Sequence, residues 1–88
     1  MFKVTEKINI KENVWEYIFN LIQEFKTEYG FIIKSLGHLE KDIYYFSMDK
    51  YTIYFEVNSK GFWLTLEADV NLKDFNMKYN FIFGKDEN

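Results

Sequence analysis

The sequence has no cysteine, proline or arginine, and it holds a single histidine, His38. Without cysteine there is neither a disulfide framework nor a thiolate zinc site, and a zinc site on the lone histidine would need three carboxylates. Without arginine the chain lacks the guanidinium that clamps phosphates and reads guanine. Its four isolated glycines also exclude a glycine-rich phosphate loop. We therefore expect no cofactor and no metal.

Long apolar runs are missing as well. No stretch approaches the roughly 18 apolar residues of a membrane span, and the start of the chain does not resemble a signal peptide. The sequence therefore predicts a cytoplasmic protein that does not contact a membrane.

Aromatic residues are abundant instead. Ten Phe, seven Tyr and two Trp make up 22% of the 88 residues, hydrophobic residues make up 48%, and the net charge is −3. An AT-rich coding sequence would by itself enrich several of these residue types. With this much apolar surface, disorder is excluded, and the length fits one domain over residues 1–88.

Within the first thirty residues, the spacing of the apolar side chains changes from that of a strand to that of a helix. Residues 2–10 alternate apolar and polar side chains, which predicts a half-buried strand, and Glu6 on the apolar side indicates an edge strand or a bulge. From residue 11 the apolar positions follow helical spacing up to residue 29. We expect a capping box between Asn9 and Glu12, a C-terminal stop at Gly30, and a wide apolar stripe that includes Trp15 and Phe19.

The remaining chain predicts strands over 31–36, 43–48, 51–57, 62–70 and 75–83, with a turn at Gly37-His38. Turns at Asp49-Lys50 and at residues 58–61 fix two registers independently. In the first, Phe46 lies opposite Ile53, and in the second, Ile53 lies opposite Leu66. Both registers place apolar residues on the same face, as strand periodicity requires.

These elements define an α+β fold. We expect one N-terminal amphipathic helix packed on one face of a five- to six-stranded antiparallel meander, in the order β-α-β-β-β-β-β. The element order resembles cystatin-like and helix-grip architectures, in which a curled sheet wraps one helix. The resemblance covers no motif, because the Gln-x-Val-x-Gly hairpin of cystatins has no counterpart, and fold-level likeness carries almost no functional information.

Catalysis needs convergent groups, and the sequence offers few. His38 stands beside no nucleophile motif, so we expect a protein that is not an enzyme. A minimal enzyme would instead need a polar pocket that holds His38 beside at least two carboxylates. An acidic chain without arginine also predicts no direct binding of nucleic acid.

The second face of the predicted meander has nothing in the chain to cover it if the single helix covers the first. Tyrosine and tryptophan within a polar rim are the composition of a protein-binding hot spot. The candidate contact residues are Ile43, Tyr45, Tyr54, Glu56, Trp63, Glu67 and Asp69. A homodimer interface and simple cross-strand packing are the alternatives for this face.

The sequence thus predicts a small non-enzymatic inhibitor that binds another protein. Such a protein would be an immunity protein against a toxin, or a phage inhibitor of a host defence protein. It would occlude a basic surface with an acidic, aromatic sheet face. The alternative is a ligand-binding module with an aromatic cavity between sheet and helix.

Overall fold

The computed structural model describes residues 1–84 as five strands and two helices. The chain runs through β1 (Phe2–Lys7), α1 (Val14–Tyr29), β2 (Ser35–Glu40), β3 (Ile43–Met48), β4 (Tyr51–Asn58), β5 (Gly61–Ala68) and α2 (Leu72–Phe83). The five strands form one antiparallel sheet in the order β1-β5-β4-β3-β2. The predicted α+β class is confirmed.

Both predicted registers are confirmed. Phe46 pairs with Ile53 between β3 and β4, and Ile53 pairs with Leu66 between β4 and β5. The first hairpin turns at Asp49, whose φ of 49° lies in the left-handed region that aspartate tolerates better than most residues. β1 then joins the meander beside β5, so the prediction of an edge strand is also confirmed.

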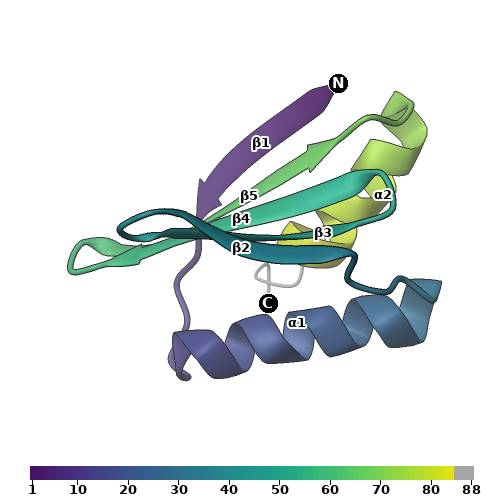
Figure 1. Cartoon of the computed structure of the whole chain (residues 1–88). Helices are drawn as coiled ribbons and strands as arrows, with labels where there is room; N and C mark the ends of the chain where they lie inside the picture. The colour runs from purple at the N-terminus through teal and green to yellow at the C-terminus, as the bar shows by residue number, and fades with distance from the viewer. Residues whose placement is uncertain (85–88) are drawn as a thin grey trace.

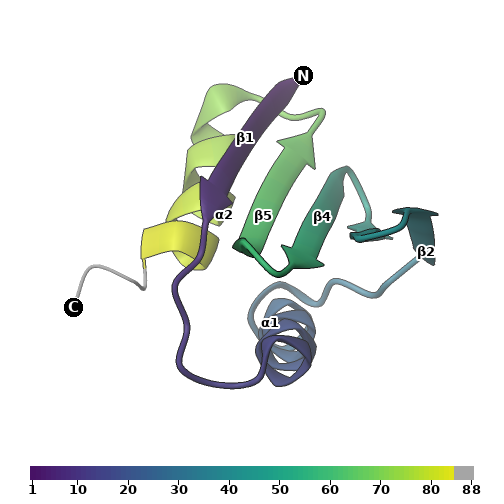
Figure 2. The ribbon, with the colours of Figure 1, turned by 90° about the vertical axis from the view of Figure 1, so that its left-hand side faces the viewer.

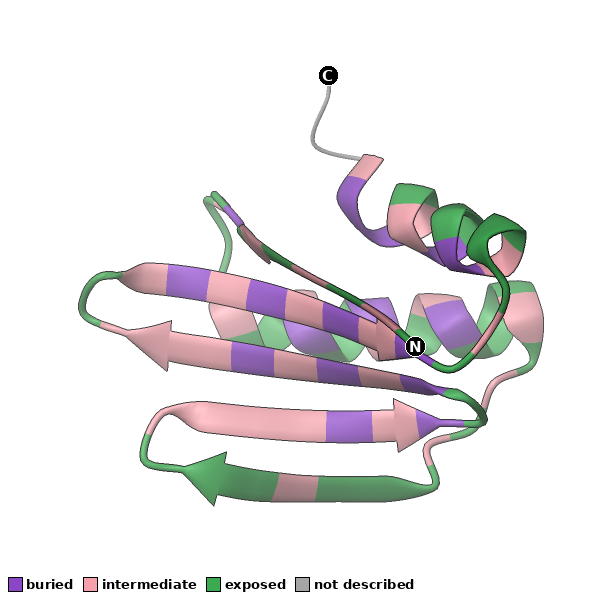
Figure 3. Ribbon diagram, turned by 90° about the horizontal axis from the view of Figure 1, so that it is seen from above, coloured by how far each residue is buried: buried purple, intermediate pink, exposed green. Residues whose placement is uncertain are grey.

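Both helices lie on one face of this sheet (Figures 1 and 2). The ring of Tyr17 in α1 packs edge-on against Phe62 of β5, and Phe75 of α2 packs against Phe2 of β1. We call this side of the sheet the helix side. Its strand residues are largely buried, and several are fully so, including Phe46, Ile53, Leu64 and Leu66. Figure 3 shows the resulting alternation of buried and half-buried residues along β4 and β5.

The boundaries of α1 differ from the prediction at its start. The helix begins at Val14, because the side chain of Asn13 accepts hydrogen bonds from the backbone N–H groups of Trp15 and Glu16. The expected capping box at Asn9 and Glu12 is wrong. The C-terminal stop at Gly30 is confirmed, with a φ of 71°.

The predicted strand over 75–83 is wrong, because these residues form helix α2. Asn71 caps it by accepting a hydrogen bond from the N–H of Asp74 at 2.8 Å. Phe75, Lys78 and Ile82 recur at helical spacing and are buried. This second helix departs from the single-helix outline of cystatin-like and helix-grip architectures.

Three further expectations need correction. The strand expected over 31–36 lies later, at Ser35–Glu40, so the Gly37-His38 step is strand and not turn. Trp15 and Phe19 are both more than half exposed, and the buried residues of α1 are Ile18, Leu21 and Phe25. Trp15 nevertheless packs edge-on against Tyr44 and Phe55 of the sheet, so Phe19 is the residue that the expected stripe wrongly included.

The acid on the apolar side of β1 has a specific partner. Glu6 accepts a hydrogen bond from the hydroxyl of Tyr79, which α2 brings to the helix side. The carboxylate is thereby satisfied next to the core, which explains why the alternation of β1 tolerates an acid there.

Candidate functional site

The side chains that alternate with the core residues form the other face of the sheet, which we call the open face. Within residues 1–84, both helices lie on the opposite side. Across the sheet, β1 contributes Lys3, Thr5 and Lys7, followed by three residues from each strand in turn: Trp63, Thr65 and Glu67; Glu56, Tyr54 and Thr52; Ile43, Tyr45 and Ser47; and Leu39, Gly37 and Ser35. The aromatic residues Trp63, Tyr54 and Tyr45 stand on β5, β4 and β3, and the aliphatic residues Ile43 and Leu39 stand on β3 and β2. The lysines lie on β1.

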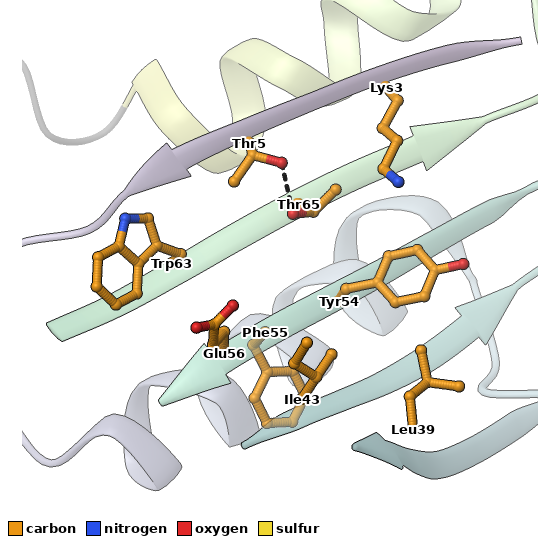
Figure 4. A pocket seen from close by; sticks show the side chains of 9 residues that line it. All are labelled: Lys3, Thr5, Leu39, Ile43, Tyr54, Phe55, Glu56, Trp63 and Thr65. Atoms are coloured by element: carbon orange, nitrogen blue, oxygen red, sulfur yellow. Dashed lines mark hydrogen bonds between the residues drawn. The ribbon is translucent and has the colours of Figure 1, made fainter. Parts of the chain in front are cut away.

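A groove of about 510 Å³ crosses this face (Figure 4). Its lining consists of Lys3, Thr5, Leu39, Ile43, Tyr54, Phe55, Glu56, Trp63 and Thr65. A second hollow of about 200 Å³ adjoins it and shares Leu39 and Tyr54 with it. The two rings of Trp63 and Tyr54 therefore stand at a concave surface, where a partner's side chain could be seated.

Six of the seven predicted contact residues lie on this face. Ile43, Tyr54, Glu56 and Trp63 line the groove, and Tyr45 lines the adjoining hollow. These residues are half-buried, because neighbouring side chains of the sheet shield one another. The expected cluster is thus assembled, although its members are less exposed than isolated surface residues.

Glu67 contacts this cluster and Asp69 does not. The hydroxyl of Tyr54 donates a hydrogen bond to Glu67 Oε1 at 3.2 Å. Asp69 lies beyond the end of β5 with its side chain exposed, and its backbone N–H donates to the carbonyl of Lys50 at 3.2 Å. The alternation that assigned Asp69 to this face ends with β5 at Ala68.

The environment of Tyr54 favours its neutral form. Burial raises the pKa of the Tyr54 phenol above its ordinary value, and the negative charge of Glu67 together with its hydrogen bond raises that pKa further. Tyr54 therefore keeps the proton that it donates to Glu67 to a higher pH than an ordinary tyrosine would.

Two lysines of β1 belong to the open face and were not among the predicted contacts. Lys3 Nζ lies 5.8 Å from the ring centre of Tyr54, and Lys7 Nζ lies 5.6 Å from that of Trp63. Lys3 also pairs with Glu67 in the cross-strand register. The alternation of residues 2–10 already separated these lysines from the apolar side, but it gave no sign that β1 pairs with β5.

Leu39 was also missed, because the strand was expected over 31–36 with a turn at Gly37-His38, whereas β2 runs from Ser35 to Glu40. The register between β2 and β3 shifts between His38 and Glu40. Leu39 follows the alternation of Ser35 and Gly37, and it lines the groove together with Ile43 and Tyr54. This leucine is 57% exposed.

Tyr45 lies flat on the sheet because β2 has a glycine opposite it. A Cβ atom added to Gly37 would stand 2.5 Å from Cε1 of Tyr45. Beside this pair, the hydroxyls of Ser35 and Ser47 are 2.5 Å apart, and at the other side of the face those of Thr5 and Thr65 are 2.7 Å apart. These four hydroxyls are thus satisfied by one another within the sheet.

His38 lies on the other side of the sheet from the two glutamates of the open face. It pairs with Tyr44 of the helix side, its ring stacks on that of Tyr44 at 4.5 Å, and its Nε2 is 3.2 Å from the carbonyl oxygen of Lys41. His38 therefore stands apart from Glu56 and Glu67, and its ring packs on a tyrosine and not against those carboxylates.

No protein family model, curated protein or solved structure matches this chain. Fold and site define it as a small α+β domain that places two helices on one face of an antiparallel sheet and a grooved aromatic surface on the other. Neither helix in the described part of the chain has the length and apolar character needed to cross a membrane.

Proposed function

We propose that this protein binds another protein through the open face of its sheet. One observation carries the proposal: Trp63, Tyr54, Ile43 and Leu39 line a groove of about 510 Å³ on a face to which the chain supplies no covering helix within residues 1–84. Concave apolar surfaces of this kind on small domains usually have a binding role, and Trp and Tyr supply large contact areas.

The charges of the open face alter the kind of partner that is proposed. Lys3 and Lys7 stand at the β1 side, while Glu56 and Glu67 lie towards the centre. A face with both signs does not require a basic partner surface. We therefore propose a partner that presents an apolar side chain to the groove, with an acidic group towards β1 and a basic group towards Glu56 and Glu67.

A finer proposal concerns the consequence of binding. A small rigid domain with aromatic anchors is suited to occluding a site on its partner, as an immunity protein or an inhibitor of a defence protein does. The net charge of −3 for the whole chain would still speed the approach to a positively charged partner. This role predicts that the partner loses its activity in the complex.

The rival proposal, a ligand cavity between sheet and helix, has less support. Leu21 and Phe25 of α1, together with Phe46, Ile53 and Leu64 of the sheet, are at most 4% exposed, so these side chains fill the space beneath the sheet. Native mass spectrometry separates the two proposals. The protein-binding proposal expects the mass of the unliganded chain, whereas a retained small molecule would favour the rival.

The proposal is tested by capture from an extract of the cells that express the chain. The double variant Tyr54→Ala/Trp63→Ala should lose a protein that the wild type retains. The matched control is Leu72→Ala, which truncates an exposed leucine at the start of α2. Melting temperatures of all three proteins establish whether the fold is intact.

A second variant covers the case in which the double variant is unstable. Thr65→Arg keeps both rings and places a long charged side chain in the groove. Loss of the captured protein by Thr65→Arg with an unchanged melting temperature supports the proposal. Equal capture by wild type, Thr65→Arg and Leu72→Ala contradicts it, as would a stable homodimer whose interface is the open face.

A further inference from the structure

Strand β2 ends the sheet and has a hydrogen-bonded neighbour on one side within residues 1–84, namely β3. Its outer edge therefore presents backbone N–H and C=O groups to the surroundings. Figures 2 and 3 show β2 at the margin of the sheet, away from both helices. Such an edge is a template for another extended chain, and proteins commonly protect it with charges, proline or a covering element.

The two edges of this sheet are protected very differently. β1 carries Lys3, Glu6 and Lys7, and α2 packs beneath it through the contact of Phe75 with Phe2. β2 has the sequence Ser-Leu-Gly-His-Leu-Glu, without lysine or proline. Its main protection is the bulge between His38 and Glu40, which leaves Ser35 to His38 in regular pairing with β3.

Exposed leucines flank this edge on both faces of the sheet. Leu36 pairs with the core residue Phe46, so it belongs to the helix side, yet it is 68% exposed because α1 does not extend beneath β2. Leu39 on the open face is 57% exposed. The edge strand therefore offers apolar contacts to both rows of side chains of an added strand.

We propose that the partner docks by strand addition: an extended segment of another protein pairs with the outer edge of β2 and extends the sheet to six strands. This inference rests on the proposed function and specifies how the partner begins its contact. The backbone edge selects an extended polypeptide, because only such a chain matches its row of donors and acceptors. Apolar residues of that segment lie beside Leu36 on one face and beside Leu39 on the other, and the second row continues into the groove.

A second copy of this chain fits the edge less well. In a two-fold antiparallel pair, opposed residues share a face, but Leu36 and Leu39 lie on opposite faces. No register of β2 with itself, within residues 35–40, places both leucines opposite a leucine. A different protein can supply apolar residues at both positions.

The test uses a synthetic peptide in which six alternating valine and threonine residues stand between two lysines. Titrated into isotope-labelled protein, it should give saturable NMR shifts along β2 and slower hydrogen exchange at the amides of Leu36 and His38, which point away from β3. The amide of Gly37, in contrast, faces β3 through its pairing with Tyr45. The same peptide with alternate backbone nitrogens methylated cannot extend the ladder and should bind at least about tenfold more weakly, the equivalent of 1.4 kcal/mol.

Variants at exposed leucines provide matched controls. Leu39→Lys adds a charge at the β2 edge and should weaken binding of the peptide at least about fivefold, whereas Leu72→Lys makes the same change on α2 and should leave it unchanged. Shifts centred outside β2, or equal binding of the methylated peptide, would overturn the proposal. Concentration-dependent dimers that Leu39→Lys dissociates would assign the edge to a second copy and overturn it as well.

This test is independent of the capture experiment. The peptide titration needs no natural partner, and it is repeated with Tyr54→Ala/Trp63→Ala, which leaves β2 unaltered. If that variant binds the peptide but captures the same proteins as the wild type, the proposed function fails while strand addition stands. If capture depends on the open face and the peptide does not bind β2, strand addition fails while the proposed function stands.

Discussion

The same strands present two faces that differ in what the chain supplies to cover them. On the helix side, Phe46 and Leu64 are fully buried beneath α1 and α2. On the open face, their sequence neighbours Tyr45 and Trp63 are half-buried and reach a groove or its adjoining hollow. Adjacent residues of one strand point to opposite faces. One residue of each such pair therefore stabilises the core, and the next is placed on the surface that we propose for binding. Four predictions test this division of roles.

The largest effect is expected from truncation at the centre of the helix side. Phe46→Ala removes a fully buried ring and should lower the free energy of unfolding by about 3–5 kcal/mol. Tyr45→Ala, one residue earlier, removes a cross-strand contact with Tyr54 and should cost about 1 kcal/mol or less. Denaturant unfolding of both variants measures the difference. Equal losses would show that the open face is part of the core.

The next effect concerns a charge on the helix side. Lys78 of α2 is 7% exposed, and its Nζ lies 4.2 Å from the ring centre of Tyr29, 5.1 Å from that of Tyr51 and 5.6 Å from that of Phe31. Desolvated cation–π contacts stabilise by about 2 kcal/mol. Lys78→Met keeps an unbranched apolar stem and should lose about that amount.

Lys73→Met is the control for Lys78→Met, because Lys73 is an exposed lysine of the same helix. Denaturant unfolding should show almost no loss for Lys73→Met. A similar loss in both variants would mean that the charge acts on α2 itself and not through the three rings.

A smaller effect is expected from pH at the open face. The raised pKa of Tyr54 means that folding favours its neutral phenol. The resulting stability is fully present below the ordinary tyrosine pKa of about 10 and is lost as the pH rises through the folded value. Tyr54→Phe should therefore flatten the fall of the melting temperature at alkaline pH.

Tyr51 on the helix side shifts in the same direction, through burial and then the charges of Asp74 and Asp49. It is the internal comparison: the alkaline fall that remains in Tyr54→Phe should diminish further in Tyr51→Phe/Tyr54→Phe. An unchanged pH profile in Tyr54→Phe would show that neither burial nor Glu67 raises the pKa of Tyr54 in solution.

The pairing of β3, β4 and β5 could be predicted from the sequence because it depends on short turns and on the alternation of neighbouring residues. The Asp49-Lys50 turn and the 58–61 loop each set a register, and both registers agree on Phe46, Ile53 and Leu66. Helix α2 could not be predicted in this way, because the aromatic residues between 75 and 83 alternate as in a strand. Its true buried stripe includes Lys78, a charge that hydrophobic periodicity does not count as apolar.

The candidate site was predictable to the extent that it depends on alternation within β3, β4 and β5. Lys3 and Lys7 join it only because β1 pairs with β5, a contact between distant parts of the chain. Leu39 was missed because the Gly37-His38 step was expected to be a turn, whereas β2 continues through it to Glu40. The face was therefore predicted as acidic, whereas it carries both signs of charge.

The open face as a contact surface is tested most directly by the chain's two tryptophans, Trp15 on α1 and Trp63 in the groove. Fluorotryptophan introduced into this chain alone gives two fluorine NMR resonances, which Trp15→Phe and Trp63→Phe assign. On addition of the captured partner, the Trp63 resonance should shift and become shielded from solvent, while Trp15, whose ring packs against Tyr44 and Phe55 on the helix side, should keep its solvent exposure. A shift of Trp15 with Trp63 unchanged would contradict the account.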